Sequence, residues 1–229
     1  MKLAIIIPAY NEEKTLKSVL LSLPKKIDGF SKVVSIVVND GSEDKTWSIA
    51  NSYANYVLTH VINMGVGSAT ITGIEGAKML NVDAAITIDA DGQHHPKDIL
   101  KLLKPISKQK ADIVIGTRSF LKKDMPIIKI IGNWLMNLLT LIIFQKWVSD
   151  SQSGMKAFSK KALDKMKLDS IGYEICSEII GEAKSRKLKV VEVPIKTIYT
   201  EYSKAKGQSI VNAINIFTKL LTIKISNKK

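Results

Sequence analysis

The feature that most constrains the fold of this 229-residue chain is the alternation of short β-branched apolar runs with helical patterns. Continuous apolar strands that are separated by helices are typical of a parallel sheet covered on both faces. The sequence therefore predicts an α/β fold with a doubly wound, mostly parallel central sheet and helices on both faces. The predicted strands are residues 3–7, 33–38, 56–61, 84–88 and 112–115, and the predicted helices are residues 12–23, 43–53, 66–80 and 96–107.

The alternation weakens after residue 115. A long helical pattern (126–147) is followed by a polar turn leading into a short strand (150–158), a predicted helix (173–186) and an extended segment (190–199). The pattern at 209–225 is that of a basic amphipathic helix. Because the chain has no internal repeat or linker, we expect one domain over residues 1–200, with an interfacial helix at 126–148, followed by a C-terminal basic amphipathic helix within 201–229.

The charge balance limits the classes of partner. Lysine and arginine number 34 against 21 acidic residues, which gives a formal net charge of +13. Arginine occurs only at Arg118 and Arg186, whereas nucleic-acid-binding proteins rely on arginine for base and phosphate contacts. The excess of lysine therefore favours an anionic lipid surface over nucleic acid. Cys176 is the single cysteine, which excludes an intramolecular disulfide.

No segment reads as a signal peptide or a membrane span. The apolar run at residues 3–7 is too short for a signal sequence. The longest uncharged stretch, residues 130–145, would form a helix of about 24 Å, which is shorter than the ~30 Å hydrocarbon core of a bilayer. We expect this helix either to lie on a membrane or to be buried in the core.

Two carboxylates follow the predicted strand at 84–88, where ligands bind in parallel sheets. Asp89 and Asp91 are two residues apart, which places both on one side of an extended chain. Their charges would repel each other without a cation, and hard oxygen ligands suit Mg²⁺ or Mn²⁺ with phosphates completing the shell. For His94 and His95, which come next, we expect a surface or capping role rather than metal binding.

Polar residues also follow other predicted strands. Tyr10 could stack on a base and Glu12 could accept from a ribose hydroxyl; alternatively, this loop is a strand exit in which Asn11 caps a helix. Asp40 could accept the imide N–H of uracil or guanine, or it could belong to a capped turn. Because the chain uses lysine almost everywhere, Arg118 suggests a site that needs bidentate phosphate binding.

Two glycines, Gly65 and Gly67, open the predicted helix at 66–80. The pattern is similar to a dinucleotide-binding fingerprint, but Thr70 stands where the third glycine belongs and the loop does not follow the first strand. This disfavours a nicotinamide oxidoreductase. The two glycines still offer backbone N–H groups to a phosphate or to a closely packed neighbour.

Five short motifs occur in a fixed order along the chain. They are PAYNE at 8–12, NDGS at 39–42, DADGQHHP at 89–96, GTR at 116–118 and SDSQSG at 149–154. In this order they resemble the family-2 inverting glycosyltransferases of the GT-A fold. The branch they resemble most is that of the polyprenyl-phosphate glycosyltransferases, which includes dolichyl-phosphate mannose and glucose synthases. The resemblance covers about residues 2–199.

The resemblance implies roles for individual residues, with GDP-mannose or a UDP-sugar as the donor. The implied donor-binding residues are Pro8, Ala9, Tyr10, Glu12, Asp40, Gly65, Gly67, Asp89, Ala90, Asp91 and Gln93. The implied metal ligands are Asp89, Asp91 and Gln93, the implied catalytic residues are Asp89, Asp91 and Arg118, and the implied acceptor-phosphate ligands are Arg118, Lys129, Lys204 and Lys206. Relatives often have a second aspartate at Asn39, so the base contact would depend on Asp40.

The implied reaction is metal-dependent transfer of a sugar to a polyprenyl phosphate. A phosphate monoester has a second pKa near ~6, so this acceptor is already anionic at neutral pH and needs positioning by cations rather than a general base. Asp150 would then orient a sugar hydroxyl or hold the turn. Two alternatives stay open: the same fold with a sugar hydroxyl acceptor in cell-surface polysaccharide synthesis, and a non-catalytic basic protein that binds membrane or nucleic acid.

A lipid acceptor implies contact with a membrane surface. Trp134 and Trp147 lie near the ends of the predicted helix, and tryptophan is enriched at membrane interfaces. The alternative is that both amphipathic helices pack on the sheet or on a second copy, which leaves a homo-oligomer open. We expect a cytoplasmic enzyme that associates peripherally with the inner face of the cell membrane and does not bind nucleic acid.

Overall fold

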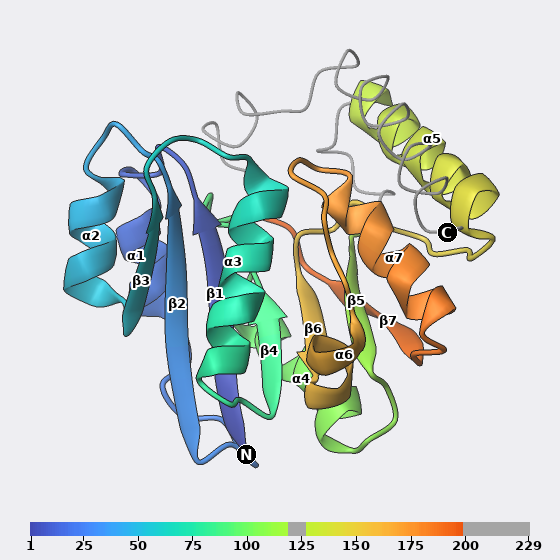
Figure 1. Ribbon diagram of the computed structural model, residues 1–229, viewed down its shortest axis with the longest axis horizontal. Coiled ribbons are helices and arrows are strands. Elements are labelled where there is room, and N and C mark those ends of the chain that lie inside the picture. Colours follow the sequence, from blue (N-terminus) through green and yellow to red (C-terminus); the bar gives the residue numbers. More distant parts are fainter. Residues whose placement is uncertain (119–126, 199–229) are drawn as a thin grey trace.

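The computed structural model describes residues 1–118 and 127–198. Its centre is a seven-stranded sheet with the strand order β3-β2-β1-β4-β6-β5-β7 (Figure 1). β6 is antiparallel to both of its neighbours, and every other pairing in this sheet is parallel. The predicted mostly parallel sheet is therefore confirmed. The strands are β1 (Lys2–Ala9), β2 (Lys32–Asp40), β3 (Tyr56–His60), β4 (Ala84–Thr87), β5 (Ile113–Arg118), β6 (Lys156–Ser159) and β7 (Val190–Ile195).

Helices cover both faces of the sheet, as predicted. The helices are α1 (Leu16–Ser22), α2 (Thr46–Tyr53), α3 (Val66–Met79), α4 (Lys97–Ser107), α5 (Ile127–Phe144), α6 (Lys160–Lys165) and α7 (Ile175–Ser185). Because successive side chains of a strand point to opposite faces, a doubly covered strand must be apolar throughout. In β1, Ile5 and Ile7 join the core that α1, α2 and α4 cover, whereas Ala4 and Ile6 join the core under α3, α6 and α7.

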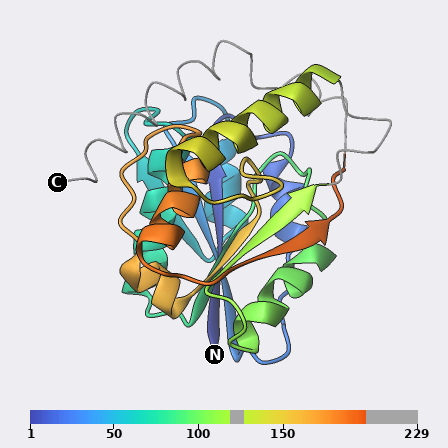
Figure 2. The same cartoon turned by 90° about the vertical axis from the view of Figure 1, so that its right-hand side faces the viewer.

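α5 stands apart from the two helical layers. It packs against α7 and lies across the upper end of the molecule in the view of Figure 1, where the parallel strands end (Figures 1 and 2). None of the helices in the described ranges combines the length and the apolarity that crossing a bilayer requires.

The start of α1 and the presence of α6 differ most from the prediction. α1 begins at Leu16 rather than at residue 12, because the N–H groups of Thr15 and Leu16 both bond to the Glu12 carbonyl and close a turn first. α6 was not predicted. It is only six residues long and begins after Ser159, whose hydroxyl accepts from the N–H of Ala162. A helix of this length shows no recognisable periodicity.

Some predictions lie outside the described residues. Lys204, Lys206 and the C-terminal helix predicted at 209–225 fall within 199–229, and the side chain of Lys129 is likewise not described.

One edge of the sheet collects the loops that the sequence analysis singled out. Six strands end at this carboxyl edge, and β6, which runs in the opposite direction, begins there. The loops after β1, β2 and β4, and the end of β5 at Arg118, therefore lie at the same edge as the segment 149–155 that precedes β6. Ligands of parallel α/β sheets bind at this edge, so the candidate site is built there.

Candidate active site

The acidic turn after β4 is closed by its own side chains. The N–H of Gln93 donates to Oδ1 of Asp91 at 2.9 Å, and the Gln93 side-chain amide donates to Oδ2. Gly92 has a φ of +77°, which favours glycine and lets the chain reverse here. The turn holds the Asp91 carboxylate close to that of Asp89, as the sequence predicted.

The Asp89 carboxylate is held from two sides. Nε2 of His94 lies 2.9 Å from its Oδ2, and the backbone of Gly154 lies on the other side. A Cβ at position 154 would come within 2.3 Å of both carboxylate oxygens, so a larger residue there would push the carboxylate aside. The Asp89 side chain nevertheless keeps 45% of its surface exposed, so it can reach a ligand.

The two histidines have different roles. The His94 side chain is only 7% exposed, so the predicted surface or capping role was wrong for this residue, which instead orients Asp89. The predicted capping role is confirmed for His95, whose Nδ1 accepts from the N–H of Lys97 at the start of α4. Sequence spacing could not separate the two, because they differ only in which side of the loop they face.

The two carboxylates differ in acidity. Burial raises the pKa of Asp89. The hydrogen bond and charge of His94 and the charges of Arg118 and Lys156 all lower this pKa, and together they outweigh burial, so the pKa lies below its usual value. Burial and the negative charge of Asp89 raise the pKa of Asp91, against the lowering effect of its bonds from Gln93. A cation beside the pair would favour the ionised form of both.

The side chains present fit a hard divalent cation. Asp89 and Asp91 supply carboxylate oxygens and Gln93 supplies an amide oxygen, which are the ligand types that Mg²⁺ and Mn²⁺ prefer. Within the described residues, no group of three or more His, Cys, Asp or Glu side chains could hold a metal. A cation here would therefore depend on oxygen atoms from a bound phosphate as well.

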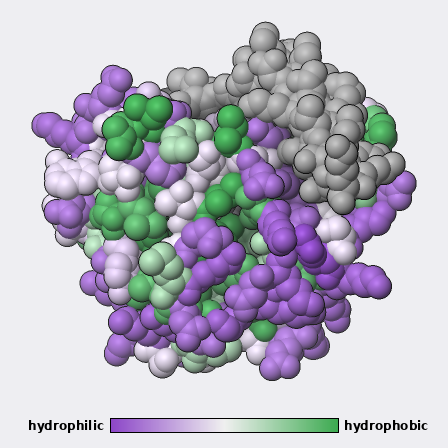
Figure 3. Space-filling model, viewed as in Figure 1, coloured by the Kyte–Doolittle hydropathy of each residue, from purple (hydrophilic) through white to green (hydrophobic). Residues whose placement is uncertain are grey.

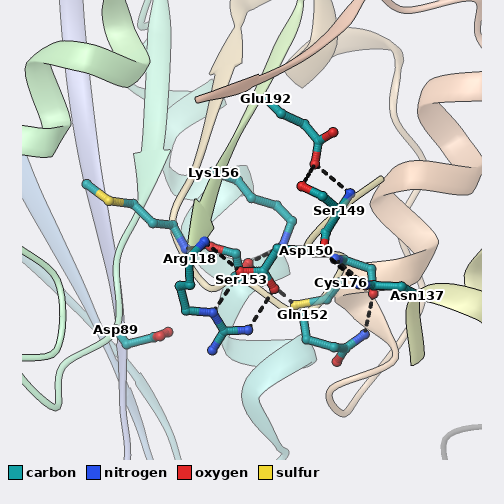
Figure 4. Close-up of polar contacts among 12 residues, drawn as sticks. Asp89, Arg118, Asn137, Ser149, Asp150, Gln152, Ser153, Lys156, Cys176 and Glu192 are labelled. Atoms are coloured by element: carbon teal, nitrogen blue, oxygen red, sulfur yellow. Dashed lines mark hydrogen bonds and ion pairs between the residues drawn. The ribbon is translucent and has the colours of Figure 1, made fainter. Parts of the chain in front are cut away.

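Arg118 forms a bidentate ion pair at the end of β5. Its Nε and Nη2 lie 2.8 and 2.7 Å from the two carboxylate oxygens of Asp150, and its backbone N–H also donates to Asp150, at 3.0 Å (Figure 4). Asp150 is fully buried. Of the two roles left open for Asp150, holding the turn is the one that the structure shows. A carboxylate engaged in this way is badly placed to act as a general base.

A buried cation lies under the same turn. Lys156, at the start of β6, is 1% exposed and donates through Nζ to the carbonyl of Ser153. Its charge reaches Asp89 and helps to lower the pKa of that carboxyl. Nothing in the sequence places Lys156 next to Asp89, so this contribution could not be predicted.

A cavity of about 490 Å³ lies beyond the ends of β1 and β2. Tyr10, Asn39 and His60 line it, and Tyr10 is 41% exposed, so its ring is available for stacking. Pro8 is half-buried and Ala9 is buried behind this loop. Of the predicted donor-binding residues, Tyr10 lines this cavity, and Asn39 and His60 are among the lining residues that the prediction did not include.

Asp40 and Glu12 are placed differently from the prediction. Asp40 does not line the cavity: it is 2% exposed, and its oxygens accept from His60 Nδ1 at 2.6 Å and from the N–H groups of Met64 and Gly65. It holds the loop after β3 rather than presenting a carboxylate to a base. Glu12 is also buried, and its carboxylate accepts from the Thr15 hydroxyl.

The glycines that open α3 pack against another loop. The N–H groups of Gly67 and Ser68 both donate to the Ile171 carbonyl, and a Cβ on Gly67 would lie 2.2 Å from the carbonyl oxygen of Ser170. Of the alternatives predicted for Gly65 and Gly67, the closely packed neighbour is the one that the structure shows. These N–H groups are already engaged and are not offered to a phosphate.

A second, smaller cavity of about 230 Å³ adjoins the acidic turn on the side of α1 and α4. Its lining combines Asp89 and His94 with apolar side chains such as Val19 and Ile99. The acidic turn therefore borders this cavity directly.

Comparison with known proteins identifies the family. The family model described as glycosyl transferase family 2 matches residues 4–167. The chain is 42% identical to UDP-N-acetylglucosamine–dolichyl-phosphate N-acetylglucosaminyltransferase of Methanococcus voltae, over 96% of this chain and 95% of that protein. It is 31% identical to dolichol-phosphate mannosyltransferase of Pyrococcus furiosus, over 95% of this chain and 61% of that protein.

The fold has solved counterparts. Glucosyl-3-phosphoglycerate synthase of Mycobacterium tuberculosis, crystallised with Mn²⁺ and UDP-glucose, superposes with a TM-score of 0.73 at 18% identity, covering 98% of this chain and 78% of that one. This likeness shows the GT-A fold that the five motifs implied. The chain belongs to glycosyltransferase family 2.

Proposed function

We propose that this glycosyltransferase transfers a sugar, with inversion, from a nucleotide-diphosphate sugar to a polyprenyl phosphate of the dolichyl type. The observation that carries the proposal is that a cation, Arg118, adjoins the acidic turn. The nearby carboxylate, Asp150, is occupied by its ion pair with Arg118. A phosphate acceptor needs a positive charge and no base, whereas a hydroxyl acceptor needs a base. The names of the relatives from M. voltae and P. furiosus support the same acceptor.

On the donor side, Asp89, Asp91 and Gln93 would hold Mg²⁺ or Mn²⁺, which supplies charge neutralisation to a departing diphosphate. Gly154 and His94 keep the Asp89 carboxylate in one orientation for this purpose. Tyr10 stacks on the base in the cavity beyond β1 and β2. Asp40 acts indirectly, by holding the loop after β3.

On the acceptor side, Arg118 binds the phosphate and brings its oxygen to the anomeric carbon. The guanidinium is held in a fixed plane by Asp150, which reduces the reorganisation needed when a phosphate arrives. Lys129, Lys204 and Lys206 stay predicted contributors to the same phosphate site.

We propose UDP-N-acetylglucosamine as the donor. The support for this is the name of the M. voltae relative, which aligns over almost all of both chains. GDP-mannose is the alternative that the more distant P. furiosus relative favours.

We further propose that the enzyme sits in the cytoplasm, on the inner face of the cell membrane, with its carboxyl edge toward the lipid. α5 exposes Trp134, Leu135 and Ile142, and the loop after β3 exposes Val61 and Ile62 at the same edge. Figure 3 shows that the lower part of the face drawn there is mainly hydrophilic, whereas apolar patches are more frequent above it. An apolar edge on a strongly basic protein suits an anionic lipid surface.

The decisive experiment supplies UDP-N-acetylglucosamine, UDP-glucose and GDP-mannose in parallel, each with Mn²⁺ or Mg²⁺ and a short polyprenyl phosphate. We expect a sugar-phosphate-lipid product with UDP-N-acetylglucosamine and none after addition of a chelator. Asp91→Asn should abolish product, whereas Glu75→Gln, on the exposed side of α3, should not. Transfer to a sugar hydroxyl but not to the lipid phosphate would overturn the proposal.

A further inference from the structure

The inner face of α5 carries a buried polar side chain whose partners lie in the active site. Asn137 is 4% exposed, although most of its neighbours along the helix are apolar. Its Nδ2 donates to the carbonyl of Ser149 at 2.7 Å, and its Oδ1 accepts from the N–H of Ser151 at 2.8 Å. One amide thus holds the backbone on both sides of Asp150 (Figure 4).

Asp150, between these two bonds, carries the next link. Its buried carboxylate receives Nε, Nη2 and the backbone N–H of Arg118. A shift of the backbone at 149–151 would move this carboxylate and the guanidinium bound to it. The position of Arg118 therefore depends on a side chain of α5 that it does not touch.

A second contact ties α5 to the same turn. The hydroxyl of Thr140, one helical turn after Asn137, bonds to that of Ser177 at 2.8 Å, and Gln152 donates to Ser177 at 3.2 Å. Ser177 belongs to α7, so α5, α7 and the turn form one hydrogen-bonded unit. This fixes the register of α5 relative to the turn.

We propose that Asn137 is a positioning residue, which sets the Arg118 guanidinium beside the acidic turn by gripping the backbone around Asp150. The residue type follows from the partners: one is an acceptor and the other a donor, and among side chains of this size only an amide serves both. Leucine would leave the buried N–H of Ser151 unpaired and remove the bond to the Ser149 carbonyl, and aspartate would face that carbonyl with a second acceptor. The effect on turnover rests on the function proposed above, whereas the positional link does not.

The positional link is tested without any substrate. Amide hydrogen exchange is measured in the whole protein for wild type, Asn137→Leu and Asn55→Ala. Asn55 is the matched control, because its Oδ1 accepts from the N–H of Ser35 in the amino half of β2, far from the site. We expect faster exchange at Ser151 and Arg118 in Asn137→Leu only. Unchanged exchange at Arg118 in that variant would overturn the proposal.

The kinetic test asks whether the link matters for transfer. A misplaced group can cost on the order of 100-fold, so kcat/KM for the lipid phosphate should fall by about that factor in Asn137→Leu while UDP–Mn²⁺ affinity stays unchanged. In an Asp150→Asn background the same substitution should add little, because both act on Arg118. If the effects of Asn137→Leu and Asp150→Asn on kcat/KM add fully, or if Asn137→Leu loses UDP–Mn²⁺ affinity, Asn137 has only a structural role and the proposal is overturned.

The two proposals fail in different ways. If wild type transfers no sugar to a lipid phosphate while exchange at Arg118 still responds to Asn137→Leu, the proposed function falls and the positional link stands. If wild type is active and Asn137→Leu retains full kcat/KM, the proposed function stands and Asn137 is not a positioning residue.

Discussion

Gly154 leaves room beside Asp89 for nothing larger than a hydrogen atom. In Gly154→Ala the new methyl group would have to displace the Asp89 carboxylate, since the contact would otherwise be 2.3 Å. We expect metal-dependent turnover to fall by about 100-fold or more, because a shift of this size in a reacting group has such effects. Mn²⁺ titration in the presence of UDP should show weaker binding, while the far-UV spectrum stays native. Unchanged Mn²⁺ affinity would contradict the assigned contact.

Asp112, which lies far from the site, makes the free energy of unfolding depend on pH. Burial raises its pKa, but the N–H of Lys189 and the ammonium of Lys161 lower it by more, so the folded pKa lies below the usual value. Its stabilising contribution is present above the unfolded pKa of about 3.9 and is lost as pH falls through the folded pKa. Because Lys161 is half exposed and solvent screens the pair, Asp112→Asn should cost no more than about 1 kcal/mol at pH 7. In urea denaturation this difference should shrink below the ordinary aspartate pKa; a pH-independent difference would contradict the account.

At the scale of elements, the junction between α3 and the loop before α7 depends on close approach. Gly67→Ala would place a Cβ 2.2 Å from the Ser170 carbonyl oxygen and disturb the bonds that the Ile171 carbonyl accepts. Overpacking of this kind costs about 1–3 kcal/mol, which urea denaturation would measure. Gly132→Ala in α5 is the control: no atom lies within 4 Å of its Cβ, so we expect no loss of stability. Equal effects at both positions would refute the packing argument.

The elements that sequence reasoning predicted are those with a local signal. The strands that build β1 to β5 are apolar runs, and the Asp89–Asp91 spacing is visible without a structure. The rest depends on contacts between distant residues. The pairing of Arg118 with Asp150 spans 32 positions, and the burial of His94 and Asp40 follows from how loops fold over them. Periodicity carries no information about such contacts, so the roles of Asp40 and His94 could not be predicted.

At the scale of the whole molecule, membrane contact would involve one edge. Replacing Trp134 and Ile142 together by serine removes exposed apolar surface from α5 without touching its buried side. We expect weaker sedimentation with vesicles of phosphatidylglycerol, and weaker binding of wild type at high salt, because each lysine near an anionic surface contributes about 1 kcal/mol. Met79→Ser, which changes an exposed apolar residue at the opposite edge, should bind like wild type. Identical binding of all three proteins would argue against this orientation.

Because β6 runs antiparallel to its neighbours, the chain enters it at the edge where the other strands end. The loops that leave β1, β2, β3 and β4 at the carboxyl edge lead into helices that pack on the two faces of the sheet. The segment entering β6 arrives instead from α5, which packs against α7. A displacement of α5 would therefore shift the backbone around Asp150 and the Arg118 guanidinium bound to it, so pressure on the outer helix bears directly on the centre of the site.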